Sequence, residues 1–327
     1  MEVFWLSQGR CERREAAELP ALLTREDGFV WLDAPSCDDE TTKTLAEIFR
    51  FHPLAIRDCC ERNHIAKLQA YPDHLFVIVH APEPGDAGQI HLLELDYFVG
   101  QRFLVTVHGP INPNVSPERA LRETSTTLRK LEEGRFAPAS AAELSHAIVS
   151  ALVAHQETLV MELTRKVAAI ERRVLSDERG GFEHALEEMF RVRHELLTLR
   201  TMAAGARELY ARMAALTRYL PPDSQPFIED LVDHFERVRS ICDSEREFLQ
   251  GVVDFYQSRT AAKMNVAMER LALISAVMLP LTLLAGIYGM NIIVNDRTQT
   301  WELGVVLVSM SVLAAVMLQW AKRQGWW

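Results

Sequence analysis

Residues 263 to 291 read KMNVAMERLALISAVMLPLTLLAGIYGMN, and the organisation of the whole chain follows from them. From Leu271 to Tyr288 there are 18 consecutive residues without a charged side chain. A helix of that length and apolarity crosses most of the hydrocarbon core of a bilayer. We therefore predict a membrane-spanning helix over residues 271–290.

Small and polar residues fall on one line along this predicted helix. Hydroxyls, amides and bare backbone are better placed against protein or water than against lipid. The line therefore fits two interpretations: a seam through which membrane helices pack, or the wall of a conduction path built from one copy per subunit. Steps of three and four residues define the line, which we call the pore stripe: Asn265, Met268, Ala272, Ser275, Leu279, Thr282, Gly286 and Gly289.

The membrane run ends in a recognisable motif. Gly289, Met290 and Asn291 close it, the segment MLPLT stands before them at 278–282, and a second apolar span follows. In these features the chain resembles the CorA family of divalent-cation channels, whose signature is a Gly-Met-Asn triplet at the end of the first of two membrane helices. ZntB-like zinc transporters are close relatives. The resemblance implies a homopentamer whose stalk helices form a cytoplasmic funnel, with the triplet as selectivity filter.

The resemblance extends into the first three quarters of the chain, through His52-Pro53-Leu54 and an acidic motif. It assigns Asp230, Asp233 and His234 to a cytoplasmic metal site between subunits, which binds Mg²⁺ and holds the pore shut. The missing ligand would come from a neighbouring N-terminal domain. The simpler alternative is that these acids only keep an exposed helix soluble. Our candidates for the missing ligand are Asp86 and Glu83.

A second membrane helix is predicted over residues 303–321. The loop before it, residues 291–302, is too short to be a domain, and the tail, residues 322–327, is basic. Lysine and arginine concentrate at the two ends that face away from this loop, so the positive-inside rule places both termini in the cytoplasm. We expect a multi-pass protein of the plasma (inner) membrane.

Composition limits the remaining possibilities. The chain has 327 residues, of which 24% are charged, so a soluble body must accompany the two spans. Its formal net charge of −10 suits cations and makes nucleic acid an improbable partner.

The start of the chain does not resemble a signal peptide, so we expect this body in the cytoplasm. Five cysteines without repeated spacing indicate reduced thiols, and for Cys59, Cys60 and His64 we favour helix packing over metal binding.

The fold class predicted for the chain is α+β. Residues 1–116 read as a cytoplasmic α/β domain, residues 117–225 as a helical hairpin, and residues 226–270 as a stalk helix that continues into the first membrane helix. Helices are also expected at Glu40 to Phe51 and Pro53 to Cys60. The expected strands are Val3 to Leu6, Phe29 to Leu32, Leu75 to His80, Ile90 to Val99 and Phe103 to Val107.

The pore stripe, together with Asn291 just beyond its end, offers neutral oxygen atoms. Asn265, Ser275, Thr282 and Asn291 can hydrogen-bond to water that is still attached to a cation, whereas carboxylates are lacking. Mg²⁺ holds its water tightly, so we infer passage of a largely hydrated ion. Residues 263–327 contain no cysteine or histidine, which argues against tight Zn²⁺ coordination in the pore but leaves hydrated Zn²⁺, Co²⁺ or Ni²⁺ possible. The apolar side chains that would narrow the path are Met268, Leu271 and Leu279.

We therefore expect a divalent-cation channel that takes up Mg²⁺ and is gated by cytosolic Mg²⁺. One alternative is a ZntB-like Zn²⁺ transporter, which could be coupled to protons. Another is a membrane-tethered coiled coil that conducts nothing. An enzyme is not expected, because the sequence has no P-loop, no His-Glu-x-x-His and no Gly-x-Ser-x-Gly motif.

Overall fold

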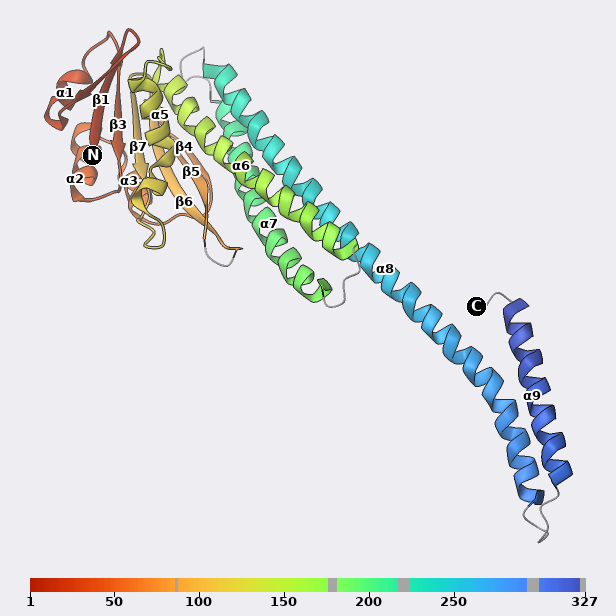
Figure 1. Ribbon diagram of the computed structural model, residues 1–327. Coiled ribbons are helices and arrows are strands. Elements are labelled where there is room, and N and C mark those ends of the chain that lie inside the picture. The colour runs from red at the N-terminus through yellow and green to blue at the C-terminus, as the bar shows by residue number, and fades with distance from the viewer. Residues whose placement is uncertain (86–87, 176–180, 217–223, 293–299, 324–327) are drawn as a thin grey trace. The chain divides into compact units, whose positions relative to one another are not determined.

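The computed structural model describes residues 1–85, 88–175, 181–216, 224–292 and 300–323 (Figure 1). The chain divides into two compact units, Met1–Gln250 and Gly251–Trp327. The finer predicted boundaries at residues 116 and 225 stay predictions.

The first unit is built on a seven-stranded mixed sheet in the order β2-β1-β3-β7-β6-β5-β4. Strands β3 and β7 run parallel, with Leu32 opposite Val105, and every other neighbouring pair is antiparallel. The strands are β1 (Glu2–Ser7), β2 (Arg10–Arg14), β3 (Phe29–Ala34), β4 (Lys67–Ala70), β5 (His74–Pro84), β6 (Ile90–Gly100) and β7 (Phe103–His108). All five predicted strands are confirmed, and β2 and β4 are additional.

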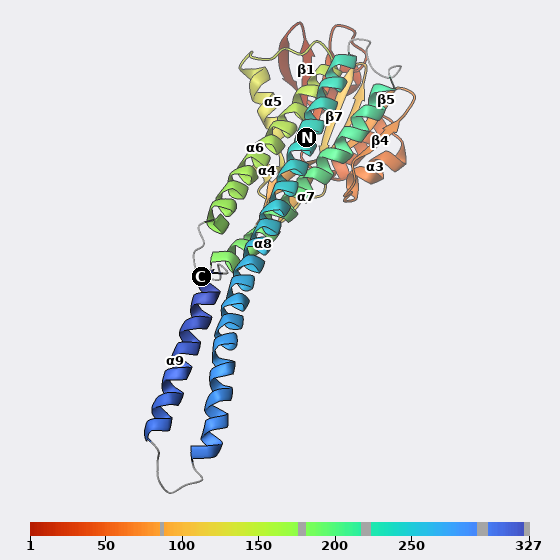
Figure 2. The ribbon, with the colours of Figure 1, turned by 90° about the vertical axis from the view of Figure 1, so that its right-hand side faces the viewer.

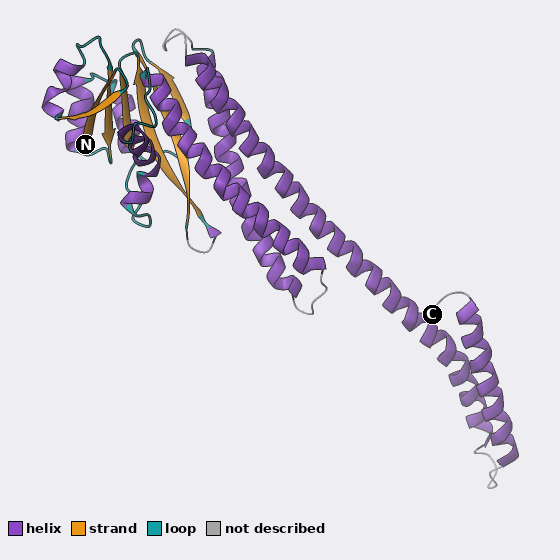
Figure 3. Cartoon of the chain, turned by 45° about the horizontal axis from the view of Figure 1, so that its top comes forward, coloured by secondary structure: helices purple, strands orange, loops and turns teal. Residues whose placement is uncertain are grey.

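Helices cover both faces of this sheet (Figure 3). Alternate strand residues point to opposite faces, and on one face Phe51, Phe76 and Phe98 form a stacked aromatic core, with Phe98 ring centroids 4.0 Å from Phe51 and 4.6 Å from Phe76. On the other face the Tyr97 and Tyr210 hydroxyls lie 2.7 Å apart and join the sheet to a helix. Double coverage explains why the central strands read as nearly unbroken apolar runs.

Short helices cover the aromatic face. The 3₁₀ turn η1 (Ala16–Glu18) and α1 (Leu19–Leu22) precede β3, and α2 (Asp39–Lys43), the π-helical segment η2 (Thr44–Ile48) and α3 (Pro53–Cys60) follow it. The single helix expected from Glu40 to Phe51 is therefore split and ends early. The reason is local: Arg50 adopts a left-handed φ of 54°, which ends the helix and turns Phe51 into the core.

The opposite face carries long helices. After α4 (Pro117–Ala120) and α5 (Arg122–Glu132), α6 (Ala141–Leu175) and α7 (Gly181–Ala214) pack against each other and form the predicted hairpin. The first third of helix α8 (Gln225–Ile292) lies beside them: Arg200 on α7 pairs with Asp243 at 2.7 Å, and Thr164 on α6 donates a hydrogen bond to Glu245. The stalk helix and the first membrane helix are thus one element of 68 residues, as predicted.

The second unit holds the rest of α8 and α9 (Thr300–Arg323). Each helix contains an 18-residue window that is long and apolar enough to cross a membrane. Two perpendicular views show that, within this unit, α9 runs back alongside α8 (Figures 1 and 2). Pro280 lies inside α8 and lacks the backbone N–H that a helix interior normally uses.

Replacing Phe98 with alanine should destabilise the first unit strongly. The ring is fully buried between two other aromatic rings, so its loss leaves a cavity, and we expect a cost of about 3–5 kcal/mol in the free energy of unfolding. Urea unfolding followed by fluorescence, to which the buried Trp5 and Trp31 contribute, measures this cost. The control Leu54→Ala, at a side chain that is 49% exposed, should cost less than about 1 kcal/mol. Equal costs would contradict the assigned core.

Candidate ion-conduction and metal-binding sites

One face of the membrane part of α8 packs toward α9. The partly buried residues of α8 fall on a single line, and the buried and partly buried residues of α9 fall on another, as expected for two helices that face each other. On α8 they are Leu273, Val277, Pro280, Leu281 and Leu284, and on α9 they are Val306, Met310, Leu313, Ala314, Met317 and Ala321.

The pore stripe lies on the opposite face of α8. Successive residues of an α-helix are about 100° apart, which places the stripe roughly 160° around the helix from the line that faces α9. A Cβ atom added to Gly286 or Gly289 would meet no atom within 4 Å, so the chain itself leaves this face open. Packing within one subunit therefore does not account for the stripe.

The polar side chains along the stripe lie on the surface of the chain, and their roles in conduction stay predictions. Asn265, Ser275 and Thr282 are exposed. The Thr282 hydroxyl donates to the Met278 carbonyl at 2.8 Å, so its oxygen lone pairs remain free to accept a hydrogen bond. Waters bound to a cation point their hydrogens outward, and a hydrated ion is therefore recognised by acceptors of this kind.

The apolar side chains predicted to narrow the path are also exposed. Met268 is 58%, Leu271 63% and Leu279 70% accessible in the single chain. Apolar rings of this kind gate channels by excluding water from a constriction. Their exposure leaves them free to meet copies of themselves.

The predicted filter lies at the end of α8. Gly289 is helical and exposed, three residues before the helix ends at Ile292. The side chains of Met290 and Asn291 lie outside the described residues. The role of the triplet therefore stays a prediction.

The acidic motif of the first unit forms a small cluster across two helices. Asp230 Oδ2 lies 2.8 Å from His146 Nε2 on α6, and Asp230 Oδ1 lies 3.6 Å from His234 Nε2 one helical turn along α8. His234 Nδ1 in turn lies 3.4 Å from a carboxylate oxygen of Glu157 on α6. We call Asp230, His234, His146 and Glu157 the stalk cluster.

The stalk cluster was only half predicted. Asp230 and His234 were identified from the sequence, whereas His146 and Glu157 were missed, because they lie 84 and 77 residues away from their partners and no local pattern marks them. Asp233 is exposed on α8 and is not among these contacts. Over the described part of the chain no group of three or more ligating side chains is arranged to hold a metal ion. A metal at this place would need further ligands.

Glu83, one of the two candidates for such a ligand, is already paired within its own chain, and its role as a ligand stays a prediction. Glu83 is only 2% exposed, and its two carboxylate oxygens lie 2.9 Å from Arg119 and 3.0 Å from Arg122. These ion pairs tie β5 to α4 and α5, and separating them would leave a buried charge without a partner. The other candidate, Asp86, lies outside the described residues.

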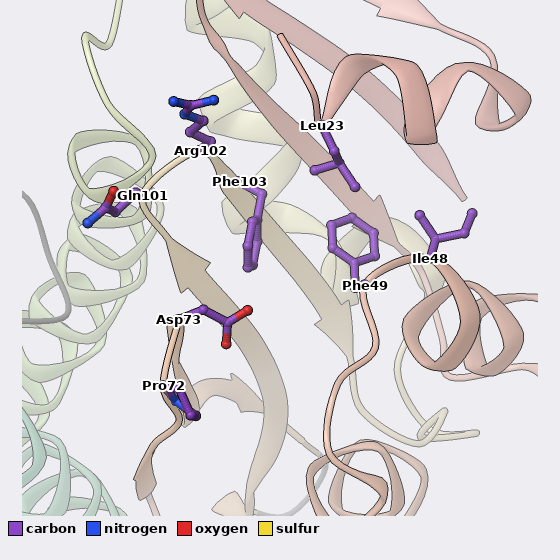
Figure 4. A pocket seen from close by; sticks show the side chains of 8 residues that line it. All are labelled: Leu23, Ile48, Phe49, Pro72, Asp73, Gln101, Arg102 and Phe103. Atoms are coloured by element: carbon purple, nitrogen blue, oxygen red, sulfur yellow. The ribbon is translucent and has the colours of Figure 1, made fainter. Parts of the chain in front are cut away.

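A hollow of about 530 Å³ opens beside the aromatic core (Figure 4). Leu23, Phe49 and Phe103 form its apolar wall, and Asp73 and Arg102 stand at its rim. Both charged groups already have partners in the chain, because Asp73 pairs with His74 at 2.7 Å and Arg102 with Glu26 at 2.9 Å. The charged groups at the rim therefore give no reason to assign a ligand to this hollow.

Comparison with known proteins places these features in a family context. The family described as CorA-like Mg²⁺ transporter protein matches residues 26–323. The Bacillus subtilis protein YfjQ is 29% identical over 301 residues, which cover 91% of this chain and 90% of YfjQ. The cobalt/magnesium transport protein CorA of Thermotoga maritima is 24% identical, over 88% of this chain and 80% of its own length.

Solved structures agree at the level of the fold. The CorA magnesium transporter of Methanocaldococcus jannaschii superposes with a TM-score of 0.77 at 16% identity, over 100% of this chain and 99% of that one. A shorter sequence match is the zinc transport protein ZntB of Yersinia enterocolitica, 23% identical over 181 residues, which cover 55% of this chain and 54% of its own. The α+β architecture expected from the sequence is confirmed.

Cysteine labelling should distinguish the two faces of α8. In a background with the native cysteines replaced, we expect Ser275→Cys to react with a water-soluble, membrane-impermeant thiol reagent at least ten times faster than Val277→Cys. Ser275 belongs to the open stripe, whereas Val277 is partly buried toward α9. The mass of the labelled protein, followed over time in proteoliposomes without divalent cations, gives both rates. Slow labelling of both positions would place the stripe against lipid.

Proposed function

We propose that this chain, which belongs to the family of CorA-like Mg²⁺ transporter proteins, assembles as a homopentamer around a pore for hydrated divalent cations. The family consists of membrane ion transporters. Mg²⁺ entering through the plasma (inner) membrane is the activity that we favour, with both termini in the cytoplasm. We also propose that cytosolic Mg²⁺ regulates the opening of this pore.

The observation that carries this proposal is the open stripe on α8. Its residues face away from α9 and meet no other part of the described chain at Gly286 and Gly289. Polar side chains and bare backbone in a membrane need protein or water next to them. Copies of α8 arranged around an axis supply both, because the stripes then surround an aqueous path and α9 faces outward.

The pore chemistry proposed here uses neutral acceptors. Oxygen atoms of Asn265, Ser275, Thr282 and Asn291 would accept hydrogen bonds from the water around a cation, so the ion need not lose its shell. Rings of Met268, Leu271 and Leu279 would form the apolar constriction that closes the path. Carboxylates are not required for passage.

Regulation is proposed to work through the stalk cluster and Asp233. Asp230 and Asp233 would bind Mg²⁺ together with groups from a neighbouring subunit, which neutralises charges that otherwise repel across the interface. Loss of Mg²⁺ would restore that repulsion and favour separation of the subunits. The predicted closed state is therefore the metal-loaded one.

The stalk cluster also favours a second candidate, a ZntB-like Zn²⁺ transporter that could be coupled to protons. Asp230 has an imidazole on each side, from His146 and His234. Imidazole suits Zn²⁺, Co²⁺ and Ni²⁺ better than Mg²⁺, which prefers oxygen ligands. This preference concerns the cytoplasmic site and not the pore.

Asn291→Ala should reduce ion flux to below about a tenth of the wild-type rate while leaving the oligomer intact, because the amide would form the entrance ring. Flux is measured in proteoliposomes with Mg²⁺ and with Zn²⁺, each with and without a pH gradient, and assembly by size-exclusion chromatography. Asn295→Ala, four residues further along the chain, is the control and should retain most activity. Unchanged flux in Asn291→Ala would contradict the proposed entrance ring. Flux that needs a pH gradient would favour the ZntB-like Zn²⁺ transporter.

Asp230→Ala should weaken inhibition by internal Mg²⁺. We expect the Mg²⁺ concentration for half-maximal closure to rise at least several-fold, since the variant loses a ligand and a negative charge. Glu247→Ala removes the same charge from an exposed position further along α8 and serves as the matched control. If the two variants close at the wild-type Mg²⁺ concentration, the acids of the stalk serve solubility alone.

A further inference from the structure

Two cysteines from different elements of the first unit nearly touch. Cys37 lies between β3 and α2, and Cys60 is the last residue of α3. Their sulfur atoms are 2.7 Å apart, although both thiols are free and 23 residues separate them in the chain. A disulfide bond measures about 2.05 Å, so less than an ångström of movement would join the two atoms.

This spacing is too short for two ligands of one metal ion. A thiolate lies about 2.3 Å from Zn²⁺, so two sulfurs in a tetrahedral site are held about 3.7 Å apart. The neighbouring group is the Thr42 hydroxyl, 3.6 Å from Cys37 Sγ and 3.8 Å from Cys60 Sγ. Two thiols and a hydroxyl do not complete a tetrahedral site.

The two thiols differ in access. Cys60 is exposed, whereas Cys37 is half-buried. Burial and the contact with Cys60 raise the pKa of the Cys37 thiol to about 12, so Cys37 keeps its proton near neutral pH. An oxidant therefore reaches Cys60 first, and Cys37 is the neighbouring thiol that can then react with the oxidised Cys60.

We propose that Cys37 and Cys60 form a reversible disulfide that makes the first unit sensitive to peroxides. The Cys60 thiolate attacks a peroxide oxygen, the O–O bond breaks, and Cys60 becomes a sulfenic acid while hydroxide or alkoxide leaves. Cys37 sulfur then attacks the Cys60 sulfur, and the departing hydroxide takes up the Cys37 proton as water. In sum, two thiols and one peroxide give one disulfide, one water and one water or alcohol.

The bond would hold the segment that leads into α2 against the end of α3. It closes a loop that contains α2 and η2, and it therefore restricts the unfolded chain more than the folded one. A dithiol reductant returns both cysteines to thiols by exchange. The oxidised protein should thus be the more heat-resistant form.

The test treats full-length protein in detergent with hydrogen peroxide, blocks the remaining thiols with N-ethylmaleimide and maps the peptides by mass spectrometry. We expect a Cys37–Cys60 linked peptide, two fewer maleimide groups than on the reduced protein, reversal by dithiothreitol, and a melting temperature several degrees above that of the reduced form. Cys37→Ser should instead accumulate a Cys60 sulfenic acid that dimedone traps, without the melting shift.

Cys11→Ser is the matched control, because Cys11 lies half-buried on β2 and takes no part in the thiol pair. This variant should form the linked peptide as the wild type does. Oxidation of Cys60 without a link to Cys37, a link between Cys60 and any other cysteine, or a linked protein that melts no higher than the reduced one would overturn the proposal.

Discussion

The structure depends on one constraint: polar groups on a membrane helix must meet protein or water. The α8 residues that are partly buried toward α9, such as Leu273, Val277 and Leu281, are apolar, whereas the amide, hydroxyl and glycine positions of the stripe remain open. Hydrocarbon offers those groups no hydrogen bonds. A second helix from the same chain has already been placed on the opposite face. The open face is the observation behind the proposal that copies of α8 surround an axis, and it is independent of the family to which the chain belongs.

The first unit supplies what such an assembly needs outside the membrane. Its sheet is covered on both faces, and the first turns of α8 are held against α6 and α7 by Arg200–Asp243, Thr164–Glu245 and His146–Asp230. These contacts attach the N-terminal third of α8 to the first unit. Asp230 lies on this part of the helix, which continues without a break to Ile292.

Sequence reasoning succeeded where burial or periodicity leaves a local pattern. Strands with both faces covered are apolar runs, whereas the edge strands β2, with the sequence RCERR, and β4, with KLQA, carry no such pattern and were missed. The stripe on α8 was visible because it repeats along one helix. The contact of His146 with Asp230 and the burial of Glu83 against two arginines were not, since both depend on which distant elements the tertiary fold brings together.

The contrast between the two candidate sites has a physical reason. A conduction path must hold a cation weakly enough to release it, and neutral oxygens that contact only the outer surface of a hydrated ion meet this need. A sensor must hold the same cation long enough to shift an equilibrium between two arrangements, which requires carboxylates and a large difference in affinity. In the proposed assignment these demands are separated by charge: the stripe residues on α8 are uncharged, whereas Asp230 and Glu157 belong to the stalk cluster and Asp233 is exposed on the same helix. If the stripe lines a pore as proposed, carboxylates placed in it would bind the ion and slow its passage.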